Sequence, residues 1–344
     1  MKRILNILVV LVVLTVWVFP LTGVQAQSGA ENAPTTGAEG ISPSDSEPQI
    51  IFPRNESVFT TTPKFRFTPA EGATKYRIDV WEGTDTSGTL LYTIKDRGTC
   101  NVEGTACWIR PPTALRAGVY NGWDGNYFWR IRAKVNGEWP TLWSQVGFTV
   151  LSPGFNSTFD LNAKKWIQLS GTWAVTGTGY LKTKGIYNTT ATILQQNMFG
   201  NDLVYEVMMK RKVEASSTNR LLFMGDPGDS YVDGFWQDGY VVDYTNEGKW
   251  SLFVSSDYTK TYLVNEEFTT AIQPFGWNKV TIWRHNSEIS VWINKQYLGT
   301  YNDATFSTGY VGIGVFELDE AASPLLVDNA RVWYSTTAPY PVSL

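Results

Sequence analysis

Histidine and cysteine are the residues that this chain of 344 amino acids almost lacks, because it has one histidine, His285, and two cysteines. A single imidazole without neighbouring cysteines cannot supply the ligands of a zinc site. The two cysteines do not form a Cys-x-x-Cys motif, so thiol redox chemistry has no support either. Binding is therefore the first hypothesis, and catalysis has to be argued for.

A strongly basic segment is also missing. Lysine and arginine total 28 residues against 32 aspartates and glutamates, which gives a net charge of −4. A mildly acidic chain without a basic stripe does not attract phosphates, so the sequence argues against nucleic acid as a partner. The same reasoning argues against docking onto anionic lipid.

A hydrophobic run lies at the N-terminus, where Lys2 and Arg3 precede the largely apolar residues 4–19. The run is short for a membrane span, which needs about 20 residues, and small residues ending at Ala26 resemble a cleavage site. It predicts a signal peptide over residues 1–26, with an uncleaved anchor as the alternative. Residues 27–47 are rich in small and acidic residues and should form a disordered linker. The mature chain should be secreted, to the extracellular space or cell surface, without membrane contact.

The two cysteines, Cys100 and Cys107, are close in the sequence. In an exported protein this spacing predicts a disulfide across a hairpin loop, with two free buried thiols as the alternative.

Aromatic residues are abundant by contrast, with 15 tryptophans, 17 tyrosines and 17 phenylalanines. Between residues 48 and 151 they alternate with polar residues, as Phe65 and Phe67 do, which is typical of half-buried strands. Asn136-Gly137 between two alternating runs predicts a tight hairpin. Residues 153–335 continue with short strand-like runs and no helical periodicity, which indicates a two-sheet sandwich. We therefore predict an all-β chain of two sandwiches, 48–151 and 153–335, and a tail, 336–344.

Two motifs in the first sandwich resemble bacterial fibronectin type III domains: Tyr127-Phe-Trp-Arg-Ile-Arg-Ala133 and Trp139-Pro-Thr-Leu-Trp-Ser144. Trp139, Trp143, Arg130 and Arg132 resemble the stacked Trp/Arg ladder of related receptor modules. The resemblance implies a structural ladder and a domain that acts as a spacer.

The second sandwich resembles the concanavalin A-like and laminin-G-like jelly rolls. The resemblance rests on four segments: 277–282, 289–299, 310–316 and 327–333. It implies the fold but not the activity, because lectins, glycosidases and adhesion modules all share this fold.

Glycoside hydrolysis needs two carboxylates about 5–9 Å apart. Hydrolases that resemble family 16 carry Glu-x-Asp-x-x-Glu on one strand, and the nearest match is Asp238-Gly-Tyr-Val-Val-Asp243. Tyr240 replaces the central acid, and neither end is glutamate, so this mechanism is not favoured. A glycosidase with a divergent carboxylate pair stays as an alternative.

Two surfaces could bind carbohydrate. Alternation places Trp283 and Trp292 on the outward face of a hairpin, where their indoles could stack on sugar rings unless a loop or the first domain covers them. Trp236 lies in a glycine-rich segment that could form the rim of a cleft. If Tyr240 and its alternate neighbours face the core, then Asp243 faces outward and could accept hydrogen bonds from sugar hydroxyls.

A structural calcium ion is a further hypothesis, because jelly rolls of this type often bind one where the chain ends meet. Asp160 and Asp328 are the candidate ligands, and solvated acids are the alternative. No other cofactor is expected. Asn55, Asn156 and Asn188 stand in N-glycosylation triplets, which matter only if the source glycosylates exported proteins.

These observations predict a secreted, non-catalytic carbohydrate-binding protein with an aromatic platform on its jelly roll. The expected partner is an extracellular glycan. An adhesion scaffold that binds a surface protein is the alternative from another functional class.

Overall fold

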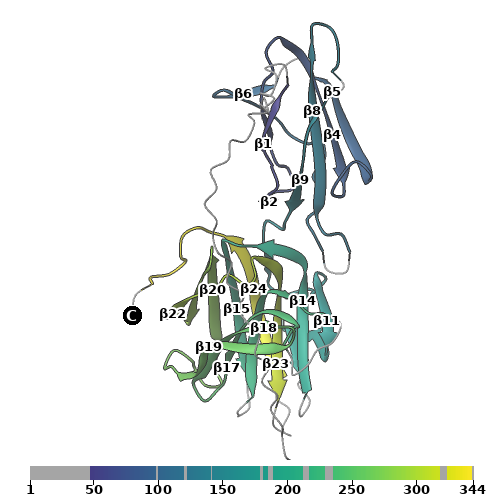
Figure 1. The fold of residues 1–344 in the computed structure, drawn as a ribbon. Coiled ribbons are helices and arrows are strands. Elements are labelled where there is room, and N and C mark those ends of the chain that lie inside the picture. The colour runs from purple at the N-terminus through teal and green to yellow at the C-terminus, as the bar shows by residue number, and fades with distance from the viewer. Residues whose placement is uncertain are drawn as a thin grey trace, which may run out of the picture. The chain divides into compact units, whose positions relative to one another are not determined.

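The computed structural model describes residues 47–97, 100–119, 122–140, 142–178, 181–184, 189–211, 217–228, 235–317 and 324–342. The predicted signal peptide, all of the predicted linker except residue 47, and Asn188 lie outside these ranges. Within them the regular elements are strands, so the prediction of an all-β chain is confirmed (Figure 1). In the same ranges no helix is long and apolar enough to cross a membrane.

Nine strands build the first sandwich. They are β1 (Gln49–Phe52), β2 (Ser57–Val58), β3 (Phe65–Thr68), β4 (Ala73–Glu82), β5 (Thr89–Arg97), β6 (Asn101–Glu103), β7 (Ala106–Ile109), β8 (Asn126–Val135) and β9 (Ser144–Val150). One sheet has the order β1-β3-β7-β6 and the other β2-β9-β8-β4-β5. Phe65, Phe67 and Trp129 are fully buried between the sheets, as the alternation predicts. Asn136 and Gly137 both have positive φ in the predicted turn between β8 and β9.

A Trp/Arg ladder lies on the outer side of the five-stranded sheet, as the sequence predicts. The guanidinium carbons of Arg130 and Arg132 lie 3.9 and 4.3 Å from the ring centre of Trp143, and Arg132 also lies over Trp139. Asp79, which is 1% exposed, pairs with Arg130 at 3.1 Å. The pairing anchors Arg130 within the ladder.

The predicted disulfide is present. Cys100 and Cys107 are bonded across the hairpin of β6 and β7, with a Cα–Cα distance of 5.3 Å.

Fifteen strands build the second sandwich. They are β10 (Phe155–Ser157), β11 (Trp166–Ser170), β12 (Thr172–Val175), β13 (Leu181–Lys184), β14 (Thr189–Gly200), β15 (Leu203–Arg211), β16 (Thr218–Asp226), β17 (Asp238–Tyr244), β18 (Lys249–Ser256), β19 (Thr259–Phe268), β20 (Asn278–His285), β21 (Glu288–Ile293), β22 (Gln296–Asn302), β23 (Thr308–Glu317) and β24 (Pro324–Tyr334). One sheet has eight strands, in the order β12-β13-β24-β15-β20-β21-β22 with β10 paired to β24. The other has seven, in the order β11-β14-β23-β16-β17-β18-β19.

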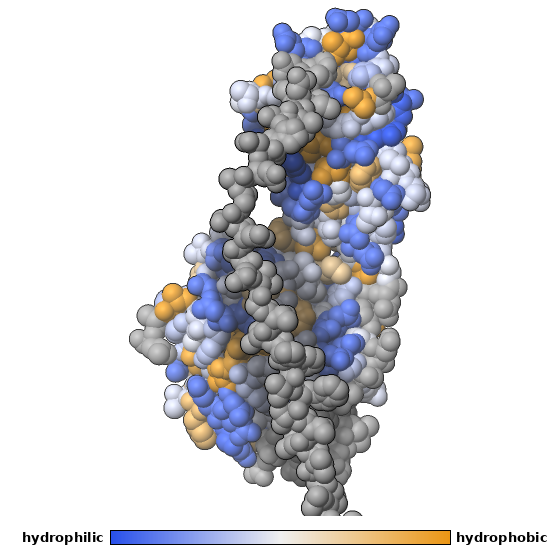
Figure 2. All heavy atoms as spheres, in the orientation of Figure 1, coloured by the Kyte–Doolittle hydropathy of each residue, from blue (hydrophilic) through white to orange (hydrophobic). Residues whose placement is uncertain are grey.

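The core of this sandwich lies between the two sheets. Tyr205 and Val207 from the eight-stranded sheet meet Tyr240, Val242 and other inward residues of the seven-stranded sheet. Burying each large apolar side chain contributes roughly 1.5–3 kcal/mol. The visible outer surface mixes hydrophilic residues with smaller hydrophobic groups (Figure 2). The two outward faces of this sandwich carry the candidate sites.

Candidate functional site

Strand β17 shows which side of the seven-stranded sheet can bind a ligand. Tyr240, Val242 and Tyr244 point into the core, whereas Val241 belongs to a separate cluster on the opposite side. Because side chains alternate along a strand, Asp243 also lies on that opposite, outward face. The structure thus resolves the orientation that the sequence left open.

Arg220 on β16 holds the carboxylate of Asp243. The two residues are direct register partners, and Arg220 Nε lies 2.9 Å from Asp243 Oδ1. Their side chains are 4% and 11% exposed. Burial raises the pKa of Asp243, although the charges of Arg220 and Lys260 oppose this effect. The pair is therefore a fixed polar group on the floor of the face.

A cleft of about 270 Å³ opens around this pair. We call it the Asp243 cleft, and it is lined by Thr218, Arg220, Asp243, Tyr244, Thr245, Glu247, Lys249, Trp250, Ser251, Lys260, Tyr262, Asn265, Glu266 and Phe316. Tyr262 on β19 is 46% exposed and its ring packs 5.4 Å from that of Phe253. Burial and the nearby charge of Asp243 raise the pKa of the Tyr262 hydroxyl. The cleft therefore combines an exposed aromatic ring with hydroxyl, amide and charged groups.

One carboxylate of β17 faces the cleft. The two preceding outward positions of the strand are Gly239 and Val241. Glu247 and Glu266 also line the cleft. Glu247 is exposed, and the Glu266 side chain is 67% exposed and pairs with Lys249 at 3.2 Å. Asp238 accepts a hydrogen bond from the backbone N–H of Asp257. The strand therefore lacks a second acid on the face of Asp243, where the family 16 pattern places one.

Trp236 does not form the rim of a cleft, and that prediction was wrong. Its side chain is 1% exposed and packs in the outward cluster with Leu222, Phe253 and Tyr310. Gly312 on β23 leaves the space that the indole ring fills, because a Cβ there would overlap the ring. Trp236 thus supports the face next to the cleft instead of offering a free ring.

Trp283 and Trp292 lie on the outward face of the eight-stranded sheet, as alternation predicts, but they are not open to a ligand. Trp283 is 8% exposed and Trp292 is 0% exposed. The C-terminal segment covers them, since their indole N–H groups donate to the carbonyls of Ser335 and Pro341. The prediction of an open tryptophan platform was therefore wrong.

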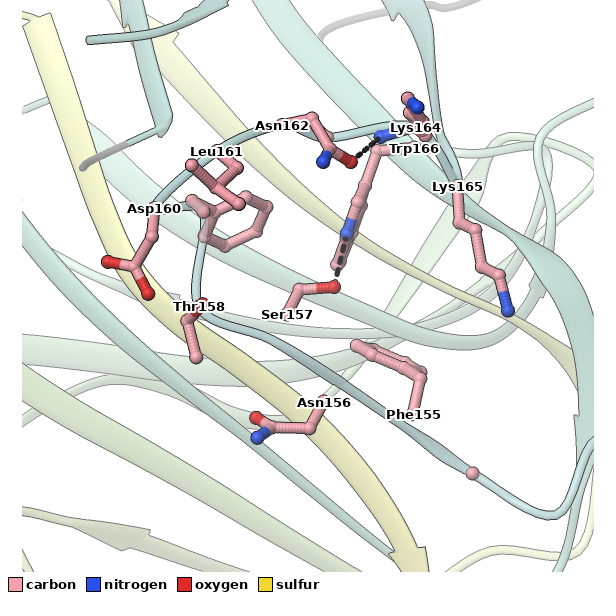
Figure 3. A pocket seen from close by; sticks show the side chains of 13 residues that line it. Phe155, Asn156, Ser157, Thr158, Asp160, Leu161, Asn162, Lys164, Lys165 and Trp166 are labelled. Carbon is pink, nitrogen blue, oxygen red and sulfur yellow. Dashed lines mark hydrogen bonds between the residues drawn. The ribbon is translucent and has the colours of Figure 1, made fainter. Parts of the chain in front are cut away.

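Asp160 and Asp328 lie near each other, as a shared cation site would require. Burial and then the negative charge of Asp160 raise the pKa of Asp328. Asp160 lies in the segment between β10 and β11, where its carboxylate points away from Trp166 and Lys165 (Figure 3). Among the described residues no group of three or more His, Cys, Asp or Glu could hold a metal. Calcium would therefore need backbone or water oxygens besides these two carboxylates.

Sequence reasoning missed Arg220 and Tyr262. Arg220 precedes the apolar run 221–224, and a charged residue in such a strand is a signal for a buried ion pair. Its partner could not be predicted, because the pairing of β16 with β17 spans the segment 227–237. No sequence pattern marked Tyr262 as a site residue.

No family model and no curated protein matches this chain. Solved structures that resemble it include the carbohydrate-binding module CBM66 from Bacillus subtilis. It is 17% identical with a TM-score of 0.39, over 48% of this chain and 94% of that one. A beta-glucanase of Bacillus licheniformis is 12% identical with a TM-score of 0.41, over 53% and 98%. The carbohydrate recognition domain of Emp46p, in its metal-free form, is 8% identical with a TM-score of 0.41, over 53% and 95%. Likenesses this low do not by themselves assign a function.

Proposed function

We propose that the chain is a secreted carbohydrate-binding protein and that its sugar site is the Asp243 cleft. The observation that carries the proposal is the exposed ring of Tyr262 beside the buried Arg220–Asp243 pair. Sugars present apolar C–H faces and ring hydroxyls, so they are bound by aromatic rings next to fixed donors and acceptors.

Each group in the cleft has a task in this proposal. The Tyr262 ring stacks on one face of a sugar ring, while Asp243 accepts and Arg220 donates hydrogen bonds that set its orientation. Phe316, whose ring lies 5.3 Å from the Arg220 guanidinium, closes the other side. Ordered water must leave the sugar hydroxyls and the cleft, so the affinity of one site should be weak.

Binding without cleavage is the form of the proposal that the geometry favours. Hydrolysis requires a second carboxylate opposite the first, about 5–9 Å away. The outward positions of β17 before Asp243 are Gly239 and Val241, which cannot transfer protons, and the other two acids that line the cleft, Glu247 and Glu266, are exposed to solvent. In this proposal the first sandwich, with its Trp/Arg ladder, acts as a spacer.

Calorimetry of the full chain against a panel of soluble glycans tests the proposal. We expect saturable heat with at least one glycan and about a tenfold weaker Kd for Tyr262→Ala, because losing a central aromatic contact costs about 1.4 kcal/mol. Phe268→Ala is the matched control, since Phe268 is a 75% exposed aromatic on the same strand, outside the cleft lining. No saturable heat with any glycan, or an equal loss in both variants, would contradict the proposal.

A further inference from the structure

The outward face of the eight-stranded sheet carries a second set of aromatic side chains, away from the Asp243 cleft. Val204, Trp283 and Trp292 form a buried cluster that is separate from the sandwich core, and Tyr297 and Trp333 pack at its edges. We call this cluster the indole groove. Its members come from neighbouring strands, because Val204 pairs with both Trp283 and Trp333 in register.

Residues 335–342 cross this groove after β24. In Figure 1 this yellow segment leaves β24 and runs toward the side of the sheet that β20 and β22 form. Ala338 and Tyr340 pack against the cluster, and the Tyr340 ring meets that of Trp292 edge to face at 6.1 Å. The segment itself has no strand pairing. Its attachment therefore depends on side-chain contacts and a few hydrogen bonds.

Side chains make three of those hydrogen bonds, and the backbone N–H of Ser335 donates another to the carbonyl of Asp202 at 2.7 Å. The indole N–H groups of Trp283 and Trp292 donate to the carbonyls of Ser335 and Pro341 at 2.9 and 3.0 Å. The hydroxyl of Tyr340 donates to Glu206 Oε2 at 2.9 Å. Proline-rich peptides commonly bind in grooves that aromatic side chains line. Here the aromatic cluster contacts Ala338 and Tyr340, and an indole N–H donates to the carbonyl of Pro341.

The two tryptophans of the groove also contact residues outside the C-terminal segment. Trp283 stacks on His285 with ring centres 5.2 Å apart, and His285 Nδ1 lies 2.5 Å from Asp202 Oδ1. Trp292 packs against Tyr297 at 5.8 Å.

Glu206 is likewise held by strand residues. Its carboxylate pairs with Lys279 and Arg331 at 3.2 and 2.9 Å, and it accepts a hydrogen bond from Thr281. Burial acts to raise the pKa of Glu206, but the Tyr340 hydrogen bond and the two cations outweigh it and lower the pKa. The acceptor for Tyr340 therefore stays ionised at neutral pH and in position.

The segment is suited to bind such a preformed surface. Pro339 and Pro341 fix their own φ angles and restrict Ala338 and Tyr340 before them, so little conformational entropy is lost when the segment binds.

We propose that the indole groove is a binding site for proline-rich peptides and that residues 338–341, Ala-Pro-Tyr-Pro, occupy it in cis. The occupant that the groove accepts is the C-terminal segment of this chain, and the same segment from a second copy makes the same contacts. This site is independent of the proposed sugar site, which lies on the other sheet.

The test uses the full chain with a protease recognition sequence inserted between Thr336 and Thr337, which are both exposed. After cleavage and dialysis, a fluorescein-labelled peptide of residues 337–344 is added and its anisotropy is measured. We expect saturable binding to the cleaved chain, and at least tenfold weaker binding to the uncleaved chain, whose tethered segment competes at an effective concentration of about 1 mM. A peptide with Tyr340→Phe should bind more weakly, because it cannot donate to Glu206.

A second variant avoids cleavage. In the uncleaved chain, Tyr340→Ala should loosen the segment and increase peptide binding, and adding Trp292→Phe should remove that gain by deleting one indole N–H. The proposal is overturned if the cleaved chain stays folded by circular dichroism but binds no peptide up to about 1 mM. It is also overturned if cleavage unfolds the chain, since the sheet alone must maintain the groove, or if Trp292→Phe leaves peptide binding unchanged.

Discussion

At the scale of single residues, the central feature is a buried charge pair beside an exposed tyrosine. Arg220 and Asp243 leave one face of the cleft polar and fixed, while Tyr262 supplies the apolar surface. A buried pair of this kind adds little net stability compared with apolar side chains, but breaking it is costly. That cost makes the pair testable without any ligand.

We expect Arg220→Met to destabilise the folded chain at pH 7 by about 3 kcal/mol, because it leaves Asp243 buried without its nearest counter-charge. Burial already raises the pKa of Asp243 in the folded state, and the substitution should raise it further. A raised carboxyl pKa means that the folded state binds the proton more tightly, so stability is greater at low pH and is lost as pH rises through that pKa.

Thermal unfolding between pH 8 and pH 5 measures this effect. The Arg220→Met variant should recover part of its lost Tm as the pH falls, and Lys249→Met is the control, since Lys249 pairs with Glu266 on the surface. Equal pH profiles for the two variants would show that the pair does not set the charge of Asp243.

At the scale of strands and loops, alternation predicted the orientation of residues well. Trp283 and Trp292 point to the outward face that their positions imply, whereas the inward orientation of Tyr240 and Val242 came from the structure. What covers a face could not be predicted in this way, since it depends on contacts distant in the sequence. Trp292 is covered by Pro341, which lies 49 residues away. Trp236 is buried because Gly312, on another strand, leaves room for its ring.

The segment between β10 and β11 and the strand β24 bring Asp160 and Asp328 together, and we propose that they contribute to a calcium site. The raised pKa of Asp328 means that its ionised form opposes folding at neutral pH, and a bound cation would remove that cost. Calcium at about 1 mM should therefore raise the Tm in buffer stripped of metals. Asp328→Asn should abolish the rise, and Asp226→Asn, an exposed acid elsewhere, should not. An unchanged Tm on adding calcium would leave only two solvated carboxylates.

At the scale of the whole molecule, the chain consists of two all-β sandwiches with different tasks in this account. The first has a Trp/Arg ladder and a short disulfide loop, and the second carries both an open cleft and a covered groove. The likeness of the first to fibronectin type III domains stays a prediction from sequence.

We also predict that the whole chain is exported and that its signal peptide is removed. Mass spectrometry of the protein collected from the medium or cell surface should give a chain that begins at Gln27, with Cys100 and Cys107 oxidised. Reducing this bond should lower stability by only about 2 kcal/mol, because the loop that it closes is short. A chain that keeps residues 1–26 would contradict secretion by cleavage.

The most direct test of the sugar-binding account is a two-dimensional NMR titration of the full chain with a glycan that gives saturable heat. We predict shifts in the side-chain Nε–H of Arg220 and in the backbone amides of Ser251 and Tyr262, with the indole signals of Trp283 and Trp292 unchanged. Shifts confined to those indoles or to the first sandwich, with β17–β19 unaffected, would contradict the assignment of the site to the Asp243 cleft.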